Sequence, residues 1–225
     1  MTEKVDFDKY TDNYNQLLWE GTSFFSSSEQ YFAKYKVDLM KKSTGHAVQR
    51  ILEYGCGIGR NVAYLQAAFP GAEIIGTDIS KASLEIARTE NPGLRFEAEH
   101  SDLELGEFDL IFVAGVFHHI PPAERPGAVA LLHARLRRGG SLSVFEHNPY
   151  NPVTRRIVDN CPYDADAILL KPAELSTLMR GAGMAVRSRG YCLFIPPWIP
   201  WLAPLENYLA WLPLGGQYWV KAGRA

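Results

Sequence analysis

The chain has 225 residues, of which 47% are hydrophobic and 21% are charged, so it can form a globular domain with a sizeable core. Its formal net charge of −2 argues against a general nucleic-acid binder, which would carry a strongly basic surface. Three scattered cysteines, Cys56, Cys161 and Cys192, form no CxxC pair, so neither a disulfide framework nor a zinc site is indicated.

The chain begins with "MTEKVDFDKY", which has neither the basic nor the apolar region of a signal peptide, and a cytoplasmic location is therefore expected. From residue 50 onward, short apolar runs alternate with segments of helical pattern. This alternation predicts an α/β fold with a parallel sheet covered by helices on both faces. Strands are expected at residues 50–54, 73–78, 94–99, 108–115, 139–147, 184–194 and 215–223, and helices at 60–69, 80–90, 122–137 and 172–180.

The stretch "ILEYGCGIGRN" (residues 51–61) places three glycines directly after the first expected strand. Gly55, Gly57 and Gly59 would let the backbone turn sharply and approach a ligand closely. In such a sheet the ligand lies outside the carboxyl ends of the strands. The dinucleotide fingerprint GxGxxG would need a glycine at position 60, which is Arg60. A nicotinamide-dependent oxidoreductase with the same sheet is therefore disfavoured.

The GxGxG spacing, with Glu53 two residues before the first glycine, resembles motif I of class I S-adenosylmethionine-dependent methyltransferases. Further motifs follow in the order that this family has. Asp78 ends the second strand in "GTDIS", and Asp102 follows the third strand in "EHSDLEL". The fourth strand contains Asp109 in "FDLI" and leads into "VFHHI", and "LRRGG" precedes the fifth strand.

The resemblance covers residues 48–147 strongly, and residues 1–20 and 171–225 more loosely. It implies one doubly wound, mostly parallel, seven-stranded Rossmann-like sheet of order 3-2-1-4-5-7-6 in a single domain. That domain would comprise an N-terminal cap (1–45), a cofactor-binding core (46–147), a lid insertion (148–170) and a C-terminal part (171–225) that contains an apolar insertion (195–214).

The resemblance also implies S-adenosylmethionine as the cofactor, with S-adenosylhomocysteine as product and no metal. Asp78 would hold the ribose hydroxyls, and Asp102 would bind the adenine amino group. Glu53 would orient the glycine loop or the methionine ammonium, and Tyr14 would close over the cofactor, with Tyr10 as the second choice. The implied cofactor-binding residues are Tyr14, Glu53, Gly55, Cys56, Gly57, Gly59, Arg60, Asp78, Ile79, Ser101, Asp102, Leu103 and Ala114.

Four residues are predicted to be catalytic, because they follow the fourth and fifth strands near the expected methyl group. They are His118, His119, Glu146 and His147. Methyl transfer needs in-line positioning and an acceptor without its proton, and histidine is the base that suits neutral pH. A structural role in the two loops is the alternative for each of them. Asn148, which completes the polar trio of the fifth strand, is expected either in the site or as an anchor of its loop.

The expected activity is O-methylation of a small molecule, by in-line displacement with a histidine base. N- or C-methylation of an amphipathic or lipid-linked acceptor is one alternative, and a cofactor-binding protein without catalysis is another. No nucleic-acid partner is expected. In the lid insertion, Arg155 and Arg156 would meet an acidic group or lie on the solvated surface.

The apolar insertion at residues 195–214 replaces a hairpin loop, for which 2–5 residues are usual. Its leucine spacing predicts an amphipathic helix between Pro204 and Pro213. Four roles are open: extra core, a homodimer interface, a substrate wall, or a peripheral membrane contact. The insertion contains Trp198, Trp201 and Trp211, with Leu205, Leu209 and Leu212 on one stripe.

Overall fold

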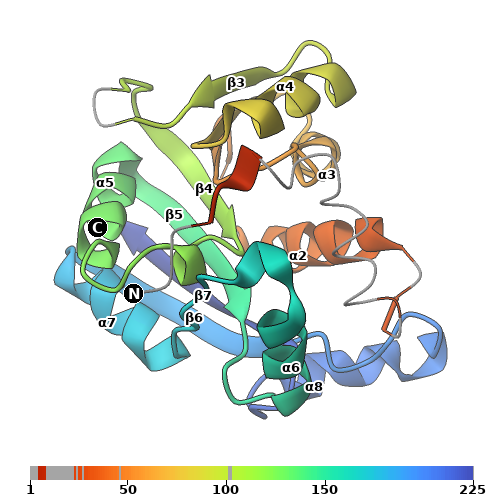
Figure 1. The fold of residues 1–225 in the computed structure, drawn as a ribbon. Coiled ribbons are helices and arrows are strands. Elements are labelled where there is room, and N and C mark those ends of the chain that lie inside the picture. Colours follow the sequence, from red (N-terminus) through yellow and green to blue (C-terminus); the bar gives the residue numbers. More distant parts are fainter. Residues whose placement is uncertain are drawn as a thin grey trace.

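The structure is a computed structural model, and it describes residues 5–8, 23, 25, 26, 28–45, 47–100 and 103–224. One seven-stranded sheet of order β3-β2-β1-β4-β5-β7-β6 forms its centre (Figure 1). The predicted strand order is confirmed. The strands are β1 (Arg50–Tyr54), β2 (Glu73–Asp78), β3 (Arg95–Ala98), β4 (Phe108–Ala114), β5 (Leu136–His147), β6 (Met184–Cys192) and β7 (Gln217–Arg224).

Strands β1 to β5 pair in parallel, whereas β7 runs antiparallel to both β5 and β6. The central strand β4 is buried over nearly its whole length, as expected for a parallel strand that is covered on both faces. Because the first five strands share one direction, the loops after β1, β2, β4 and β5 all emerge at the same edge of the sheet. That edge carries the candidate site.

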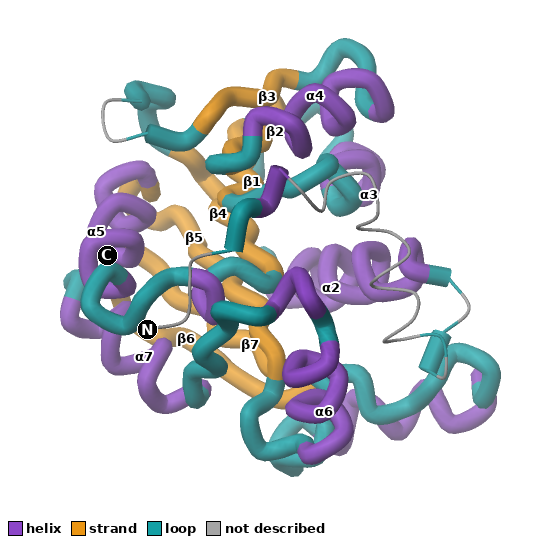
Figure 2. The backbone as a smooth tube through the Cα atoms, viewed as in Figure 1, coloured by secondary structure: helices purple, strands orange, loops and turns teal. Residues whose placement is uncertain are grey.

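Helices cover both faces of the sheet, which Figure 2 shows as an orange layer between purple helices. Consecutive residues of β1 point to opposite sides: Leu52 packs in a core with α5 and α7, and Ile51 packs in a core with α2, α3 and α4. The doubly wound arrangement predicted from the sequence is confirmed. The helices are α2 (Glu29–Ser43), α3 (Val62–Ala68), α4 (Lys81–Glu90), α5 (Arg125–Arg135), α6 (Pro152–Asn160), α7 (Pro172–Gly181) and α8 (Glu206–Leu209).

The apolar insertion contains less helix than the leucine spacing predicts. A 3₁₀ helix, η4 (Pro200–Leu205), leads into α8, which is a single turn. α8 ends at Leu209, because the next carbonyl, that of Ala210, accepts a 2.8 Å hydrogen bond from the Tyr191 N–H of β6 and not from a helical N–H. Glu206 anchors the segment, because its carboxylate accepts hydrogen bonds from the backbone N–H groups of Phe194 and Ile195 and from the Tyr35 hydroxyl.

The tryptophans of the insertion do not form extra core. Trp198, Trp201 and Trp211 are 65%, 73% and 76% exposed, and we call these three side chains the tryptophan patch. The predicted role as extra core is therefore wrong for these three tryptophans, since each leaves most of its surface open to solvent. Among the described residues, no helix has both the length and the apolar composition that crossing a bilayer requires.

Candidate active site

A cavity of about 860 Å³ lies at the carboxyl edge of the sheet, and its size is in the upper part of the usual range for small-molecule sites. Most of the predicted site residues line it. Of the predicted set, Glu53, Gly59, Leu103 and Glu146 lie outside its lining, and Tyr14, Ser101 and Asp102 lie outside the described residues. Those that do line it are Gly55, Cys56, Gly57, Arg60, Asp78, Ile79, Ala114, His118, His119 and His147.

The glycine loop, residues 55–59, forms one wall of this cavity. Gly57 has a φ of 53°, a left-handed conformation that favours glycine, and a Cβ built on it would meet no atom within 4 Å. The backbone at Gly57 therefore opens directly onto the cavity. Gly55 and Cys56 hold the loop to the neighbouring strand, because both N–H groups donate to the Thr77 carbonyl, at 2.8 and 2.9 Å.

Asp78, at the end of β2, connects the glycine loop to the next helix. One carboxylate oxygen accepts a 2.8 Å hydrogen bond from the Gly57 N–H, and the other accepts a 2.8 Å bond from the Ser80 N–H. Burial raises the pKa of Asp78, although these backbone bonds act in the opposite direction. The carboxylate also lines the cavity, so it fixes the loop and can accept hydrogen bonds from a ligand.

Glu53 is 1% exposed and lies behind the glycine loop. Its Oε1 accepts a 2.6 Å hydrogen bond from Asn61, whereas Oε2 has no hydrogen-bond partner among the described residues. Burial raises the pKa of Glu53 to about 8, and burial lowers the pKa of the cavity-lining Lys36 to about 8. The unpartnered oxygen could accept one further hydrogen bond, but Glu53 lies outside the cavity lining.

Glu146, the last residue but one of β5, holds the loop after β4 in place. Its Oε1 accepts hydrogen bonds from the N–H groups of Val116 and Phe117, and its Oε2 lies 2.6 Å from His118 Nδ1. Because Glu146 is fully buried and lies outside the cavity lining, its contacts are those of a positioning residue.

Three imidazoles, those of His118, His119 and His147, line the same cavity as the glycine loop, and we call them the histidine rim. The ring centroid of His118 lies 4.1 Å from that of His119 and 4.9 Å from that of His147. The 3₁₀ helix η2 (Phe117–His119) supplies the first two, and the end of β5 supplies the third. The sequence therefore identified three side chains that the fold does bring together.

The pKa values of two histidines of the rim are shifted in opposite directions. Burial would lower the pKa of His118, but the charges and hydrogen bonds of Glu146 and Asp164 outweigh it and raise that pKa to about 10. Burial, with the neighbouring His118, lowers the pKa of His147 to about 4. Burial would raise the pKa of Asp164, but the hydrogen bonds of His118 and His119 outweigh it and hold that pKa well below its usual range.

Asn148 anchors a loop, which is the structural alternative given for it above. The side chain is fully buried, and its amide donates to the carbonyls of Pro213 and Gly215, at 3.1 and 2.7 Å. Its oxygen accepts from the Tyr150 N–H at 3.0 Å. Asn148 thereby joins the exit of β5 to the segment before β7, and it does not line the cavity.

Several cavity residues carry no signal in the local sequence. Lys36 comes from α2, Glu99 follows β3 in an ion pair with Arg135, and Asn151 and Tyr163 come from the segment after β5. Asn151 is the N-cap of α6, a role that its position before a proline indicates. Its place at the cavity follows only from the tertiary packing. Arg155 and Arg156 lie on the exposed face of α6, outside the cavity lining.

Residues 52–142 match the family model described as "Methyltransferase domain". A trans-aconitate 2-methyltransferase of Deinococcus radiodurans is 35% identical over 96 residues, which cover 42% of this chain and 36% of that protein. A ubiquinone biosynthesis O-methyltransferase of Aromatoleum aromaticum is 30% identical over 133 residues, covering 55% of this chain and 54% of that protein. The chain spans between 27% and 58% of the length of such curated relatives.

Solved structures show the same fold over almost the whole chain. A methyltransferase of Thermotoga maritima, described as a possible histamine N-methyltransferase, has a TM-score of 0.69 at 18% identity and covers 97% of this chain and 98% of its own. The magnesium protoporphyrin IX methyltransferase of Synechocystis with bound S-adenosylmethionine has a TM-score of 0.65 at 14% identity, with full coverage of both chains. The Rossmann-like methyltransferase fold and the resemblance to the class I enzymes are confirmed.

Proposed function

We propose that this chain, whose residues 52–142 match a methyltransferase domain, transfers a methyl group from S-adenosylmethionine to a small-molecule acceptor. One observation carries the proposal: a single cavity is lined by the glycine loop, by Asp78 and by the histidine rim. Donor and acceptor can therefore meet within it. No glycine occupies position 60, so the nicotinamide alternative gains no support from the glycine loop.

In this proposal Asp78 accepts hydrogen bonds from the ribose hydroxyls while it holds the Gly57 N–H. Glu53, which lies behind the glycine loop and outside the cavity lining, orients that loop, and Arg60 or Lys36 faces the methionine carboxylate. Ile79 and Ala114 would contribute apolar contact to the cofactor. The roles given from sequence to Tyr14, Ser101, Asp102 and Leu103 stay predictions, as does the cytoplasmic location.

We further propose that the acceptor atom is oxygen and that His147 is the general base. His147 lines the cavity, and the structure gives its side chain no hydrogen bond to a carboxylate among the described residues. Both ring nitrogens of His118, in contrast, face carboxylates, those of Glu146 and Asp164. Relatives named for trans-aconitate and for O-methylation in ubiquinone biosynthesis support an oxygen acceptor. Nitrogen and carbon acceptors remain the alternatives.

Calorimetry with S-adenosylhomocysteine tests the cofactor assignment. Asp78→Ala should weaken binding by ~1.5–3 kcal/mol, because it removes a charged acceptor for two hydroxyls. Asp159→Ala, which removes an exposed carboxylate on α6, is the matched control and should bind like the wild type. Equal affinity of the Asp78 variant and the wild type would remove Asp78 from the cofactor site.

Transfer of labelled methyl groups to a panel of carboxylic acids, phenols and amines tests the reaction. With an acceptor in hand, His147→Ala should lower kcat by ~100-fold or more and leave the affinity for S-adenosylhomocysteine nearly unchanged. His100→Ala removes an exposed histidine and serves as the control. A His147 variant with full turnover would exclude this base. Binding without transfer to any acceptor would favour the cofactor-binding protein that lacks catalysis.

We also propose that residues 148–170 act as a lid over the acceptor and that the tryptophan patch contacts a lipid surface. Asn151, Thr154 and Ile157 of the α6 region line the cavity, which supports the first assignment. Exposed tryptophan favours the boundary between water and lipid, which supports the second. A homodimer through the same patch is the alternative.

A further inference from the structure

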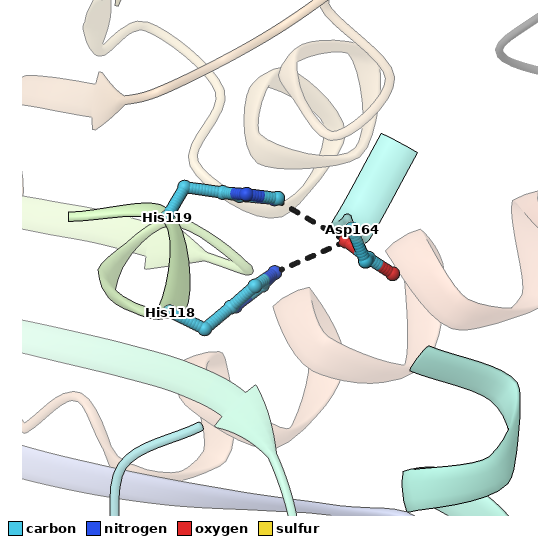
Figure 3. A group of neighbouring side chains, drawn as sticks. All are labelled: His118, His119 and Asp164. Atoms are coloured by element: carbon cyan, nitrogen blue, oxygen red, sulfur yellow. Dashed lines mark ion pairs between the residues drawn. The ribbon is translucent and has the colours of Figure 1, made fainter. Parts of the chain in front are cut away.

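Two histidines and one aspartate converge at the histidine rim, from segments far apart in the sequence. His118 and His119 lie on η2, and Asp164 lies on the 3₁₀ helix η3 (Pro162–Asp164) (Figure 3). Each residue offers one ligand atom, and these three atoms all lie within 4.8 Å of one another. The three side chains are 2%, 10% and 8% exposed, so the cluster is largely shielded from bulk water.

The distances suit a shared ion better than direct hydrogen bonds. Asp164 Oδ1 lies 3.5 Å from His118 Nε2 and 3.3 Å from His119 Nε2. A charge-assisted N–H···O bond is shorter, at ~2.7–2.9 Å. Two donor atoms that are each ~2.0–2.1 Å from one ion lie ~3.0–3.4 Å apart, depending on the coordination geometry. Both measured separations lie close to that range.

The second nitrogen of each histidine faces its own carboxylate. His118 Nδ1 lies 2.6 Å from Glu146 Oε2, and His119 Nδ1 lies 3.1 Å from Asp166 Oδ1. Such acceptors hold a proton on Nδ1 and turn the Nε2 lone pair toward the shared centre. In this tautomer both lone pairs face Asp164 Oδ1, and a cation placed between the three atoms would bind all of them. Histidines that ligate metals have this carboxylate–histidine arrangement.

We infer that His118 Nε2, His119 Nε2 and Asp164 Oδ1 form a binding site for a divalent transition-metal ion such as Zn²⁺ or Fe²⁺. Two imidazoles and one carboxylate match the donor preference of these ions, whereas Mg²⁺ and Ca²⁺ prefer oxygen ligands alone. This proposal replaces the expectation of no metal. No local sequence pattern indicates this site, because Asp164 lies 45 residues beyond His119 and reaches the histidines only through the fold.

The site lies where it could serve the reaction. His118 and His119 also line the cavity, so an ion between them can be reached by an oxygen atom of a bound molecule. An ion in this position acts as a Lewis acid and lowers the pKa of an oxygen that it binds. This consequence alone rests on the proposed methyl transfer, and it favours an acceptor with a metal-binding oxygen.

Metal binding can be measured without any turnover assay. The purified protein is stripped with a chelator and titrated calorimetrically with Zn²⁺, and with Co²⁺, whose visible absorption reports the ligand set. We expect one ion per chain, with imidazole-containing coordination. The variants His119→Ala and Asp164→Asn should each weaken binding by ~100-fold or more. Asp166→Asn should weaken it by ~10–100-fold, because Asp166 only supports a ligand.

Two controls match the variants in chemistry but lie elsewhere. His100→Ala and Asp159→Asn remove an exposed histidine and an exposed carboxylate, and both should bind Zn²⁺ like the wild type. Wild-type protein without saturable Zn²⁺ or Co²⁺ binding overturns the inference, as does unchanged binding in the His119 and Asp164 variants. Binding of S-adenosylhomocysteine to the wild-type protein is measured in parallel. If the wild type does not bind S-adenosylhomocysteine, the proposed function is contradicted. If it binds S-adenosylhomocysteine but no metal, only the metal site is contradicted.

Discussion

At Gly57 the effect of a side chain on backbone strain can be distinguished from its effect on the space for a ligand. It has a positive φ, and its missing Cβ points into open space at the cavity. Gly71 shares both properties, with a φ of 87° and no atom within 4 Å of a built Cβ, but it does not line the cavity. A side chain at either position therefore carries a similar backbone strain, of roughly 1–2 kcal/mol.

We predict that Gly57→Val abolishes measurable binding of S-adenosylhomocysteine, whereas Gly71→Val leaves its affinity unchanged. Both variants should lose similar amounts of unfolding free energy, because the strain is common to them. Calorimetry gives the affinities, and urea unfolding gives the stabilities. Undiminished binding by the Gly57 variant would show that the cofactor does not approach this part of the loop.

Glu53 gives a prediction about pH. Its folded-state pKa of about 8 lies above the ordinary value of 4.5, so the folded chain keeps a proton that the unfolded chain releases. This contribution to stability is complete below the ordinary pKa, and it is lost as the pH rises through about 8. Glu53→Gln does not titrate. Its unfolding free energy relative to wild type should therefore rise between pH 5 and pH 8, by up to a few kcal/mol.

Thermal and urea unfolding of both proteins across that pH window provide the measurement. Glu104→Gln, at an exposed position, is the control and should show a constant difference from wild type. A constant difference for Glu53→Gln as well would mean that the folded protein holds Glu53 with an ordinary pKa.

Among the elements, β5 and the loop that follows it depend on Asn148. Asn148→Ala removes two bonds to buried carbonyl groups and one from the Tyr150 N–H. We predict a loss of about 2–4 kcal/mol of unfolding free energy, because the partners stay buried without replacement. Asn160→Ala, at the exposed end of α6, should change stability by less than ~0.5 kcal/mol. A similarly small loss at position 148 would contradict the anchoring role.

Elements whose ends are marked locally were predictable from the sequence. The bounds of β1 and β2 agree to the residue, because each apolar run is closed by the start of a turn. Ser80 caps α4 at the start of the predicted helix 80–90, with its side chain accepting from the Ser83 N–H. The insertion helix was predicted too long, because leucine spacing says nothing of a carbonyl that bonds to β6 or of a carboxylate that binds backbone elsewhere.

The same distinction holds for the site. Gly57 and Asp78 were identified because their roles depend on a few neighbouring residues. Lys36 and Asp164 were missed, since they reach the site through helices that approach it only in the folded chain. Glu146 was placed among the catalytic residues from its position at the end of the fifth strand, whereas its neighbours in space are backbone N–H groups and an imidazole.

For the whole molecule, the tryptophan patch is the feature that the methyltransferase core does not require. Its three side chains project from the insertion between β6 and β7, and Tyr208 of the same segment is 75% exposed. The segment is held to the fold through Glu206 and Tyr35 and through the carbonyls of Ala210 and Pro213, whereas its tryptophan side chains stay exposed to solvent. Large exposed aromatic groups of this kind mark interaction sites.

We predict that the protein binds vesicles of mixed zwitterionic and anionic lipids, with a blue shift of tryptophan emission. Replacing Trp198, Trp201 and Trp211 together with serine should weaken binding by roughly 10-fold or more, because the apolar area available for insertion is lost. Ile168→Ser, which removes an exposed apolar side chain outside the patch, should bind vesicles as the wild type does. The emission and sedimentation of each protein are measured with and without vesicles. An unshifted spectrum in a protein that sediments as a dimer would instead place the patch at a subunit interface, since burial against a second copy would keep it from the lipid.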